Sequence, residues 1–341
     1  MKILVVGGAG YIGSHVVLDL LERKEEVTVY DNLSTGTKKN LLPQARFVKG
    51  DILDYSRLQK TLQPGFDAIF HFAALKAAGD SMVAIEKYCL NNITGTINLL
   101  NAASECGVPY FVFSSSAAIY GEPSYSPIDE KHPLDPVNVY GFTKLEIERL
   151  LPWYHRVKGL KYACLRYFNA AGFDTRGRIT GLEKNVTNLL PVLMETAAGM
   201  RASVQLFGTD YQTRDGTGLR DYIHVTDLSD AHLKALDYIR ANKQNLAVNL
   251  GSENGITVKE MLEATRQITG HPIPAEMTAR RPGDPAAVMA SSAAAKSLLG
   301  WEPRFSDAHT LISSTWKVYK QYQKNRKTED ITRTSRNQKM G

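Results

Sequence analysis

Residues 2–13 read Lys2-Ile3-Leu4-Val5-Val6-Gly7-Gly8-Ala9-Gly10-Tyr11-Ile12-Gly13, and the expected fold class follows mainly from this motif. It opens with a short apolar run typical of a buried strand, and a helical pattern follows at residues 14–23. The glycines between them permit a tight turn and a close approach of the backbone to a pyrophosphate. The N-terminus of the following helix then offers that anion free N–H groups and a favourable dipole. A glycine motif alone is weak evidence, but this one has the strand–turn–helix context that dinucleotide binding requires.

Strand and helix patterns alternate through the first half of the chain. Further strands are expected at residues 26–30, 45–49, 68–72, 110–114 and 161–168, with long helices at 91–106 and 140–155. Nearly continuous apolar strands that alternate with helices indicate a parallel sheet covered on both faces. We therefore predict an α/β protein with a Rossmann-type, doubly wound parallel sheet.

The pattern becomes less regular after about residue 172, where glycines, prolines and polar loops separate shorter elements. We predict an NAD-binding domain at residues 1–172 and a smaller α/β C-terminal domain for the substrate at 173–316. Segments near residues 221–250 could return to the first domain. Residues 317–341 are expected to form a basic, poorly ordered tail.

The excess positive charge is confined to that tail. The chain has 41 Lys and Arg against 35 Asp and Glu, a net charge of +6. Residues 317–341 contain eight basic and two acidic residues, so the rest of the chain is neutral. A basic tail can bind nucleic acid, but a solvated C-terminus is the simpler interpretation, and no nucleic-acid partner is predicted.

Other features argue against a membrane, disulfide or metal protein. No run of about 18 apolar residues is present, so no membrane span is expected. The three cysteines, Cys89, Cys106 and Cys164, are scattered, which favours a reducing cytoplasm. The eight histidines show no HxH or HxxxH spacing, so no metal site is predicted.

Asp31 ends the second expected strand, 18 residues after Gly13. A carboxylate there can accept hydrogen bonds from the ribose hydroxyls of an adenosine, and it would repel the 2′-phosphate of NADP. NAD is therefore the expected cofactor. Asp51, after the third strand, is placed to meet the adenine edge. Both aspartates could instead serve only as turn residues.

Tyr140 and Lys144 form a YxxxK pair, which places both side chains on one face of the expected helix. A nearby ammonium and a positive nicotinamide would favour the phenolate and lower the pKa of the tyrosine. A phenolate can then remove a hydroxyl proton while hydride leaves the same carbon. Ser116 follows the strand before this helix, at the sheet edge where ligands bind, and can hydrogen-bond the reacting oxygen.

Together these motifs resemble the extended short-chain dehydrogenase/reductase superfamily, and within it the UDP-galactose 4-epimerase family. The resemblance reaches from the first strand to about residue 301. It is most specific where Asp215-Gly216-Thr217-Gly218-Leu219-Arg220-Asp221-Tyr222-Ile223-His224-Val225 follows Phe207-Gly208-Thr209-Asp210-Tyr211, and in Arg166-Tyr167-Phe168-Asn169.

The motifs and the resemblance together give the candidate site residues. Ser116, Tyr140 and Lys144 are the catalytic candidates. The cofactor set is Gly7, Gly10, Tyr11, Ile12, Gly13, Asp31, Asn32, Ser34, Thr35, Gly36, Asp51, Ile52, Phe72, Ala73, Ala74, Lys76, Asn91, Tyr140, Lys144 and Phe168. The UDP-sugar set is Ser116, Asn169, Asn188, Leu189, Phe207, Arg220, Tyr222, Arg281, Asp284 and Val288. The resemblance implies that Arg220 and Arg281 hold the diphosphate and Asp284 the uridine ribose.

The activity implied is the interconversion of UDP-galactose and UDP-glucose through a transient 4-keto sugar, with NAD retained tightly. The family also implies a homodimer built on the helices at 91–106 and 140–155. Val288 occupies a position that borders the hexose in the family. Because valine is smaller than the tyrosine that restricts that position, acceptance of UDP-N-acetylglucosamine and UDP-N-acetylgalactosamine is hypothesised.

Two kinds of alternative function remain open from the sequence. The first is another nucleotide-sugar enzyme of the superfamily, such as a 4,6-dehydratase or an epimerase of pentose or uronic acid sugars. A dehydratase is expected to carry acidic residues directly after the serine, whereas this chain has Ser116-Ala117-Ala118. The second is a non-catalytic NAD-binding protein, which the presence of Tyr140 and Lys144 disfavours.

Overall fold

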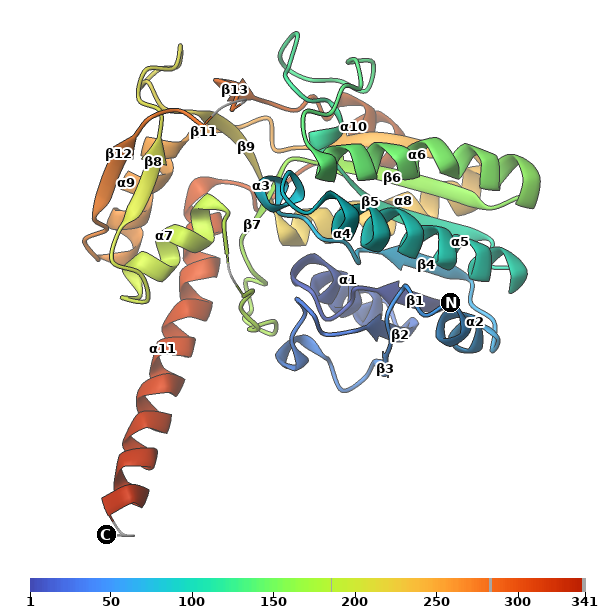
Figure 1. The fold of residues 1–341 in the computed structure, drawn as a ribbon, viewed down its shortest axis with the longest axis horizontal. Coiled ribbons are helices and arrows are strands. Elements are labelled where there is room, and N and C mark those ends of the chain that lie inside the picture. The colour runs from blue at the N-terminus through green and yellow to red at the C-terminus, as the bar shows by residue number, and fades with distance from the viewer. Residues whose placement is uncertain (185, 282–283, 339–341) are drawn as a thin grey trace.

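The structure of the protein is a computed structural model that describes residues 1–184, 186–281 and 284–338. Its centre is a seven-stranded sheet with the order β10-β6-β5-β4-β1-β2-β3, and every neighbouring pair in it is parallel. Figure 1 shows this sheet between two layers of helices. The strands of this sheet are β1 (Lys2–Val6), β2 (Glu26–Asp31), β3 (Arg46–Lys49), β4 (Ala68–His71), β5 (Tyr110–Ser116), β6 (Lys161–Tyr167) and β10 (Leu246–Leu250).

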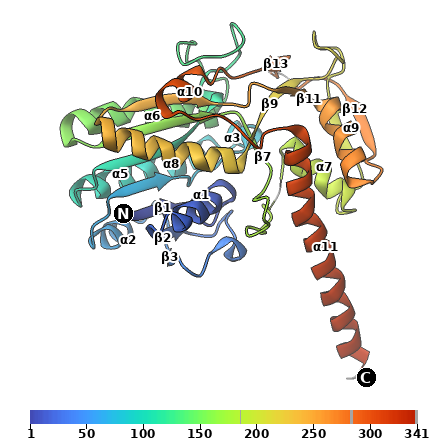
Figure 2. The same ribbon diagram turned by 180° about the vertical axis from the view of Figure 1, so that it is seen from behind.

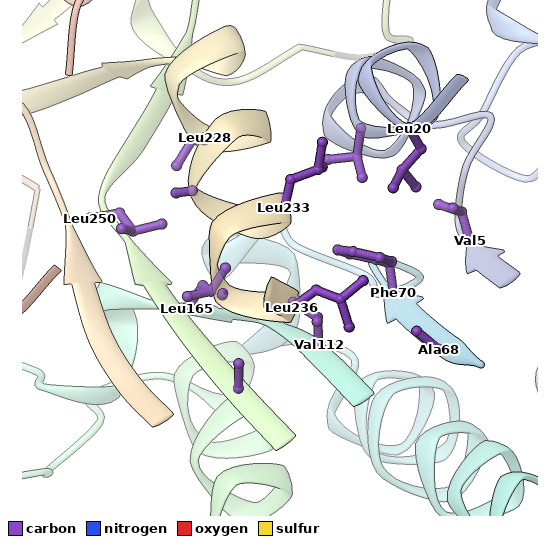
Figure 3. Packing of buried hydrophobic residues seen from close by; sticks show 14 of the residues in the cluster. Val5, Leu20, Ala68, Phe70, Val112, Leu165, Leu228, Leu233, Leu236 and Leu250 are labelled. Atoms are coloured by element: carbon purple, nitrogen blue, oxygen red, sulfur yellow. The ribbon is translucent and has the colours of Figure 1, made fainter. Parts of the chain in front are cut away.

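The predicted α/β class and doubly wound parallel sheet are confirmed. The strands of the sheet are apolar throughout because both of its faces are covered. In β1, successive side chains enter the cores on opposite faces of the sheet. Ile3 and Val5 belong to the core under α1 and α8, whereas Leu4 and Val6 belong to the core under α2, α5 and α6, and all four are fully buried. Figure 3 shows the first of these cores, where Leu233 and Leu236 of α8 approach Leu20 of α1 and the sheet.

Helices cover both faces of the sheet. The helices of this part of the molecule are α1 (Tyr11–Glu22), α2 (Tyr55–Leu62), α3 (Ala78–Ser81), α4 (Ile85–Tyr88), α5 (Gly95–Glu105), α6 (Val139–Lys158), α8 (Val225–Asn242) and α10 (Ala293–Leu299), with short 3₁₀ turns at Lys38–Asn40 and Ala117–Ile119. Figure 2, seen from behind, shows α8 beside α1 on one face of the sheet. Residues after 224 thus return to this sheet as α8 and β10.

The helix predicted at residues 91–106 is shorter and less regular than expected. A π-helical segment, Cys89–Thr94, precedes α5, so regular helix begins only at Gly95. Asn92 lies in that segment, and its buried amide bonds the backbone of Leu75 and the hydroxyl of Thr143. The strand and helix predictions elsewhere in the first half differ from the structure by a few residues at their ends.

The remaining elements form a smaller α/β layer beside the carboxyl ends of the large sheet's strands (Figure 1). β9 (Leu219–His224) pairs with β7 (Asn169–Ala171), β11 (Gly255–Thr257) and β13 (Ala287–Val288). β8 (Val204–Phe207) pairs with β12 (Ala275–Thr278), and α7 (Leu189–Ala197), α9 (Val258–Thr269) and α11 (Ala308–Gln338) pack together.

The predicted tail boundary at residue 317 is wrong. α11 continues through it, and Val318 and Tyr319 are buried. Ile312, Trp316 and Tyr319 recur at helical spacing and pack into the core of the smaller layer, so the apolar pattern overrides the local charge. Figure 1 shows the rest of α11 leading away from the body of the protein. No helix in the described ranges is long and apolar enough to cross a membrane.

Candidate active site

The glycine loop between β1 and α1 forms the floor of a cleft. Gly7 has a φ of 84°, and a Cβ at this position would lie 2.6 Å from the backbone nitrogen of Ala73. A Cβ at Gly13 would lie 2.3 Å from the carbonyl oxygen of Gly7, so helix and turn can approach only without side chains. Gly10 caps α1 without a side chain, which leaves the first-turn N–H groups for a ligand. This cradle fits a dinucleotide pyrophosphate.

Asp31 stands at the carboxyl end of β2, in the wall of this cleft. Its carboxylate accepts hydrogen bonds from the backbone N–H groups of Ala9 (3.0 Å) and Leu33 (2.7 Å). It therefore has the turn role considered from the sequence, and it also lines the cleft. Burial raises the pKa of Asp31, although the two backbone donors oppose that shift.

The cleft collects many of the predicted cofactor residues. Its lining consists of Val6, Gly7, Gly10, Tyr30, Asp31, Asn32, Ser34, Thr35, Gly50, Ile52, Phe72, Ala73, Ala74, Leu75 and Asn91. Val6, Tyr30, Gly50 and Leu75 are additions, and their apolar or glycine character gives no chemical signal in the sequence. The adjacent strand ends β1, β2 and β4 bring this set together.

The other predicted cofactor residues do not line the cleft. The Tyr11 phenol donates to the carbonyl of Gly172, and Ile12 packs against the core. Asp51 accepts a hydrogen bond from the Asn32 amide at 2.8 Å. Lys76, in the segment between β4 and α3, forms an ion pair with Glu183, in the segment between β7 and α7. Gly13 and Gly36 lie against the backbone of the glycine loop. Phe168 packs on a small core of Ile119, Tyr120, Ile128 and Leu145, called here the Ile119 cluster.

Ser116, Tyr140 and Lys144 converge where β5 ends and α6 begins. Asn138 caps α6 by accepting from the N–H of Gly141 at 2.8 Å, so Tyr140 lies in its first turn. The Ser116 hydroxyl interacts with the Tyr140 phenol, and this interaction by itself lowers the pKa of the phenol. The ammonium nitrogen of Lys144 lies 5.9 Å from the centre of the Tyr140 ring and donates to the carbonyl of Ser114 at 2.7 Å.

The electrostatics of this trio differ from the sequence-based expectation. Burial raises the pKa of Tyr140, and the interaction with Ser116 only partly offsets that shift. Burial also lowers the pKa of Lys144 to about 7. In the protein alone, therefore, the lysine does not bring the tyrosine pKa below its ordinary value. Desolvation of both groups outweighs their mutual attraction.

A second cavity of about 590 Å³ is lined by elements of the smaller layer, among them β7, which directly follows β6 in the chain. It is lined by Asn169, Ala170, Ala171, Val186, Thr187, Asn188, Leu189, Leu190, Pro191, Val192, Arg201, Ser203, Val204, Gln205, Phe207, Arg220, Tyr222, Val258, Arg281 and Asp284. All predicted UDP-sugar residues except Ser116 and Val288 are in this set. Arg201, Ser203 and Gln205 are polar additions that no motif in the sequence marks.

Charge is concentrated in this cavity. Arg220 forms an ion pair with Asp284, and the Arg281 guanidinium lies 3.7 Å from the centre of the Phe207 ring. Two arginines beside an aromatic ring can bind a diphosphate and a flat base. Val288 packs instead on the Ile119 cluster, together with Phe168 and Ala117, the residue after Ser116. It therefore lies near the turn that follows Ser116 and outside the lining of the cavity.

The fold and the two cavities define an NAD-binding enzyme of the short-chain dehydrogenase/reductase type, with a second site for a nucleotide. Within the described ranges, no group of His, Cys, Asp and Glu gathers as a metal site would require. The chain matches the model of the NAD dependent epimerase/dehydratase family over residues 3–251, and it belongs to that family.

Individual relatives are similar over nearly the whole chain. The UDP-glucose 4-epimerase of Halalkalibacterium halodurans is 46% identical over 331 residues, which are 97% of this chain and 99% of that protein. The crystal structure of the Brucella ovis UDP-glucose 4-epimerase with NAD has a TM-score of 0.91 at 42% identity, covering 93% of this chain and 98% of the other. The Bifidobacterium longum enzyme with NAD⁺ and UDP has a TM-score of 0.88 at 34% identity, covering 94% and 98%.

Proposed function

We propose that the protein is a UDP-glucose 4-epimerase, which interconverts UDP-galactose and UDP-glucose. The observation that carries this proposal is the position of Ser116, Tyr140 and Lys144 at the strand ends, between a glycine-floored cleft and an arginine-lined cavity. The similarity to UDP-glucose 4-epimerases supports the choice of substrate.

Tyr140 removes the proton of the sugar 4-hydroxyl, and the Ser116 hydroxyl shares the hydrogen bond to the same oxygen. NAD, held by the residues of the glycine-floored cleft, would supply the reversible hydride acceptor that oxidation at C4 requires. Lys144 holds its positive charge beside the phenol and stabilises the phenolate form. The resulting 4-keto sugar turns about its link to the diphosphate, so that hydride and proton return to the opposite face.

This chemistry requires firm binding of the nucleotide and loose binding of the hexose, because the sugar must turn. Arg220 and Arg281 supply charge for the diphosphate, and Phe207 offers a ring for the base. Asp284 is assigned to the uridine ribose. The polar wall of this cavity also includes Asn169 and Asn188. The cofactor residues keep the roles expected from the sequence, with Asp31 on the adenosine ribose and Asp51 near the adenine.

The domain division is proposed in a modified form. The cofactor domain comprises residues 1–172 together with α8 and β10, since α8 packs on α1 and β10 pairs with β6. The substrate domain comprises the rest of 173–316 and the part of α11 whose Trp316 and Tyr319 enter the same core. The placement of three free cysteines, unpaired with one another, supports a cytoplasmic location.

A homodimer is proposed on the face formed by α3, α4 and α6. Large apolar side chains are exposed there: Met82, Val83, Ile85, Leu90, Phe142, Trp153 and Val157. Their occurrence on neighbouring elements is typical of a subunit interface. Light scattering after gel filtration should give twice the chain mass, and Trp153→Glu should lower that mass. A monomer for the unaltered chain would contradict the dimer.

The direct test of function is incubation of the purified protein with UDP-galactose without added cofactor, followed by quantification of UDP-glucose. Conversion to a mixture of the two sugars would establish C4 epimerisation together with retained NAD. If no conversion occurs even with NAD added, other nucleotide sugars become the candidates, and then the non-catalytic NAD-binding alternative.

A further inference from the structure

Three consecutive serines of β5 contact three residues of α6 that are spaced four apart. Ser116 interacts with Tyr140, and the carbonyl of Ser114 accepts from Lys144. The hydroxyl of Ser115, between them, donates to a carboxylate oxygen of Glu148. Because residues at i, i+4 and i+8 lie along one helix face, Glu148 extends the face that carries the catalytic pair by one turn. The YxxxK motif is therefore the first part of a longer row.

Glu148 is buried and paired. Its exposed fraction is 8%, and that of Arg166 on β6 is 6%. The Arg166 guanidinium binds both carboxylate oxygens, with Nη2–Oε2 at 2.6 Å and Nε at 3.1 Å from each oxygen. Another guanidinium nitrogen donates to the Tyr120 hydroxyl at 2.9 Å, which in turn donates to the side chain of Asn249 on β10. The carboxylate is thus fixed from two strands.

A buried ion pair of this kind is expected to add little to the stability of the fold, because the desolvation of two charges commonly offsets their attraction. Its position beside Lys144 gives it a different use. Lys144 is only 4% exposed, and burial disfavours its charge. A fixed carboxylate one helical turn away opposes that effect through space.

The other titratable groups around Lys144 do not supply this counter-charge. His71 on β4 has its pKa lowered to about 3 by burial, so it is neutral at physiological pH. Burial raises the pKa of Tyr167 and Cys164 on β6 and of Tyr140 on α6, which keeps them uncharged. β5 contributes the Phe113 ring, 4.8 Å from the ammonium, and the Ser114 carbonyl. Of these neighbours, Glu148 and Arg166 form a buried ion pair.

We propose that Glu148 is a positioning residue for the reaction: held by Arg166 and Ser115, it favours the charged form of Lys144 and fixes the strand end that carries Ser116. The two-oxygen contact with Arg166 fixes the orientation of the carboxylate on the side of β6. Lys144 therefore remains available to the phenol and to the cofactor.

The test is Glu148→Gln, studied in the full-length protein as purified with its cofactor. The ionisation of Lys144 is followed by NMR of ¹³Cε-labelled lysine, with Lys144→Met used only to assign its signal. We expect the midpoint of Lys144 to fall by about one pH unit, which is roughly a tenfold change in its protonation equilibrium. The alkaline limb of kcat should move to lower pH by the same amount, while NAD content and UDP affinity stay unchanged.

Glu146→Gln is the matched control, since Glu146 lies on the same helix and pairs with the exposed Arg149. It should leave the midpoint and the pH profile unchanged. If Glu148→Gln does not fold, the double variant Glu148→Gln/Arg166→Met removes both charges without leaving a buried cation unpaired. It should show the same lowered midpoint.

An unchanged lysine midpoint in a folded variant would overturn the proposal, as would a uniform loss of kcat at all pH values. If neither variant folds, as judged by circular dichroism, the carboxylate serves the fold and the proposal is also wrong. The activity readout rests on the proposed epimerase function, whereas the NMR titration does not. Failure of the function would therefore leave the lysine result to be judged separately.

Discussion

Arg220 and Asp284 form an ion pair across the mouth of the larger cavity, although 64 residues separate them in the sequence. Arg220 also donates to the carbonyl of Leu219 at 2.8 Å, so its guanidinium is held in place before any ligand binds. The side chain is only 15% exposed. A cation fixed in this way suits the diphosphate role proposed for it. The carboxylate of Asp284 offsets part of the free-energy cost of keeping the guanidinium half-buried.

Replacement of Arg220 by methionine should weaken UDP binding. A hydrogen bond to a charged group contributes about 1.5–3 kcal/mol, so the Kd for UDP should rise roughly 10- to 150-fold. Titration calorimetry with UDP measures this directly. Arg214→Met is the control, because Arg214 is exposed and pairs with Glu260 away from the cavity. Equal affinity in the Arg220 variant would remove this residue from the diphosphate site.

Tyr140→Phe should abolish most turnover and leave UDP binding intact. General base catalysis contributes about 10²- to 10⁴-fold, and kcat should fall within that range. The ring remains, so the cleft keeps its shape. Steady-state conversion of UDP-galactose and calorimetry with UDP separate the two effects. Tyr125→Phe removes an exposed phenol that bonds Asp129, and it should behave like the unaltered protein.

The sequence predicts the cofactor half well because its signals are local. The glycine loop and Asp31 lie within a single strand–helix–strand unit, and the apolar strands leave few other arrangements. Tyr140 and Lys144 are recognised by spacing on one helix. Glu148 is not predicted from the sequence, although it continues the same spacing, because a glutamate on a helix is ordinarily solvated. Its burial can be recognised only once the structure pairs it with Arg166.

The substrate half can be predicted only through resemblance. Arg220, Asp284 and Phe207 meet through strands β8, β9 and the segment before β13, and no local pattern announces those pairings. Arg201, Ser203 and Gln205 escape prediction for the same reason. The predicted start of the tail is misplaced because it is drawn from the positive charge of residues 317–341. The apolar spacing of Trp316 and Tyr319, which carries the helix past residue 317, is a weaker signal in the sequence.

The buried Lys144 should make stability depend on pH. Its folded pKa of about 7 lies below the ordinary 10.5, so between these values the unfolded chain binds more protons and stability rises with pH. Below pH 7 the full penalty applies, and each tenfold change in the protonation equilibrium corresponds to about 1.4 kcal/mol. Lys144→Met should therefore raise the melting temperature relative to the unaltered protein more at pH 6.5 than at pH 9.5.

The apolar packing lost in that variant is the same at both pH values, so the difference between them reports the charge of Lys144, including its charge-assisted hydrogen bond to Ser114. Differential scanning fluorimetry of both proteins at each pH provides the comparison. A constant difference in melting temperature would show that Lys144 titrates alike in the folded and unfolded chain.

Trp316→Ala should destabilise the protein by about 3–5 kcal/mol, as expected for the removal of a buried tryptophan. Trp316 is 4% exposed and packs in the core of the smaller layer, directly before the start of the predicted tail. Chemical denaturation measures the free energy of unfolding. Lys320→Ala, one turn further along α11 on an exposed position, should change it by less than about 0.5 kcal/mol. Similar values for both variants would contradict the packing of α11.

Val288→Tyr should separate N-acetylated from simple hexoses. Val288 is half-buried beside Phe168 and one residue of the Ser116 turn, so a larger side chain there would occupy space near the sugar. A steric contact of this kind is worth about 1–3 kcal/mol, and kcat/KM for UDP-N-acetylgalactosamine should fall roughly 10- to 200-fold. The value for UDP-galactose should stay within about twofold, because that sugar lacks the acetamido group.

Val288→Ile is the matched control, since it adds a single methylene and should affect the two substrates alike. Conversion of each UDP-sugar is followed by chromatography of the nucleotide sugars under initial-rate conditions. Two results would reject the hypothesis. One is the absence of N-acetylated turnover in the unaltered protein, and the other is an equal loss on both substrates in Val288→Tyr. In the second case the tyrosine would be disturbing the Ile119 cluster beneath Ser116 rather than excluding a substituent at C2 of the hexose.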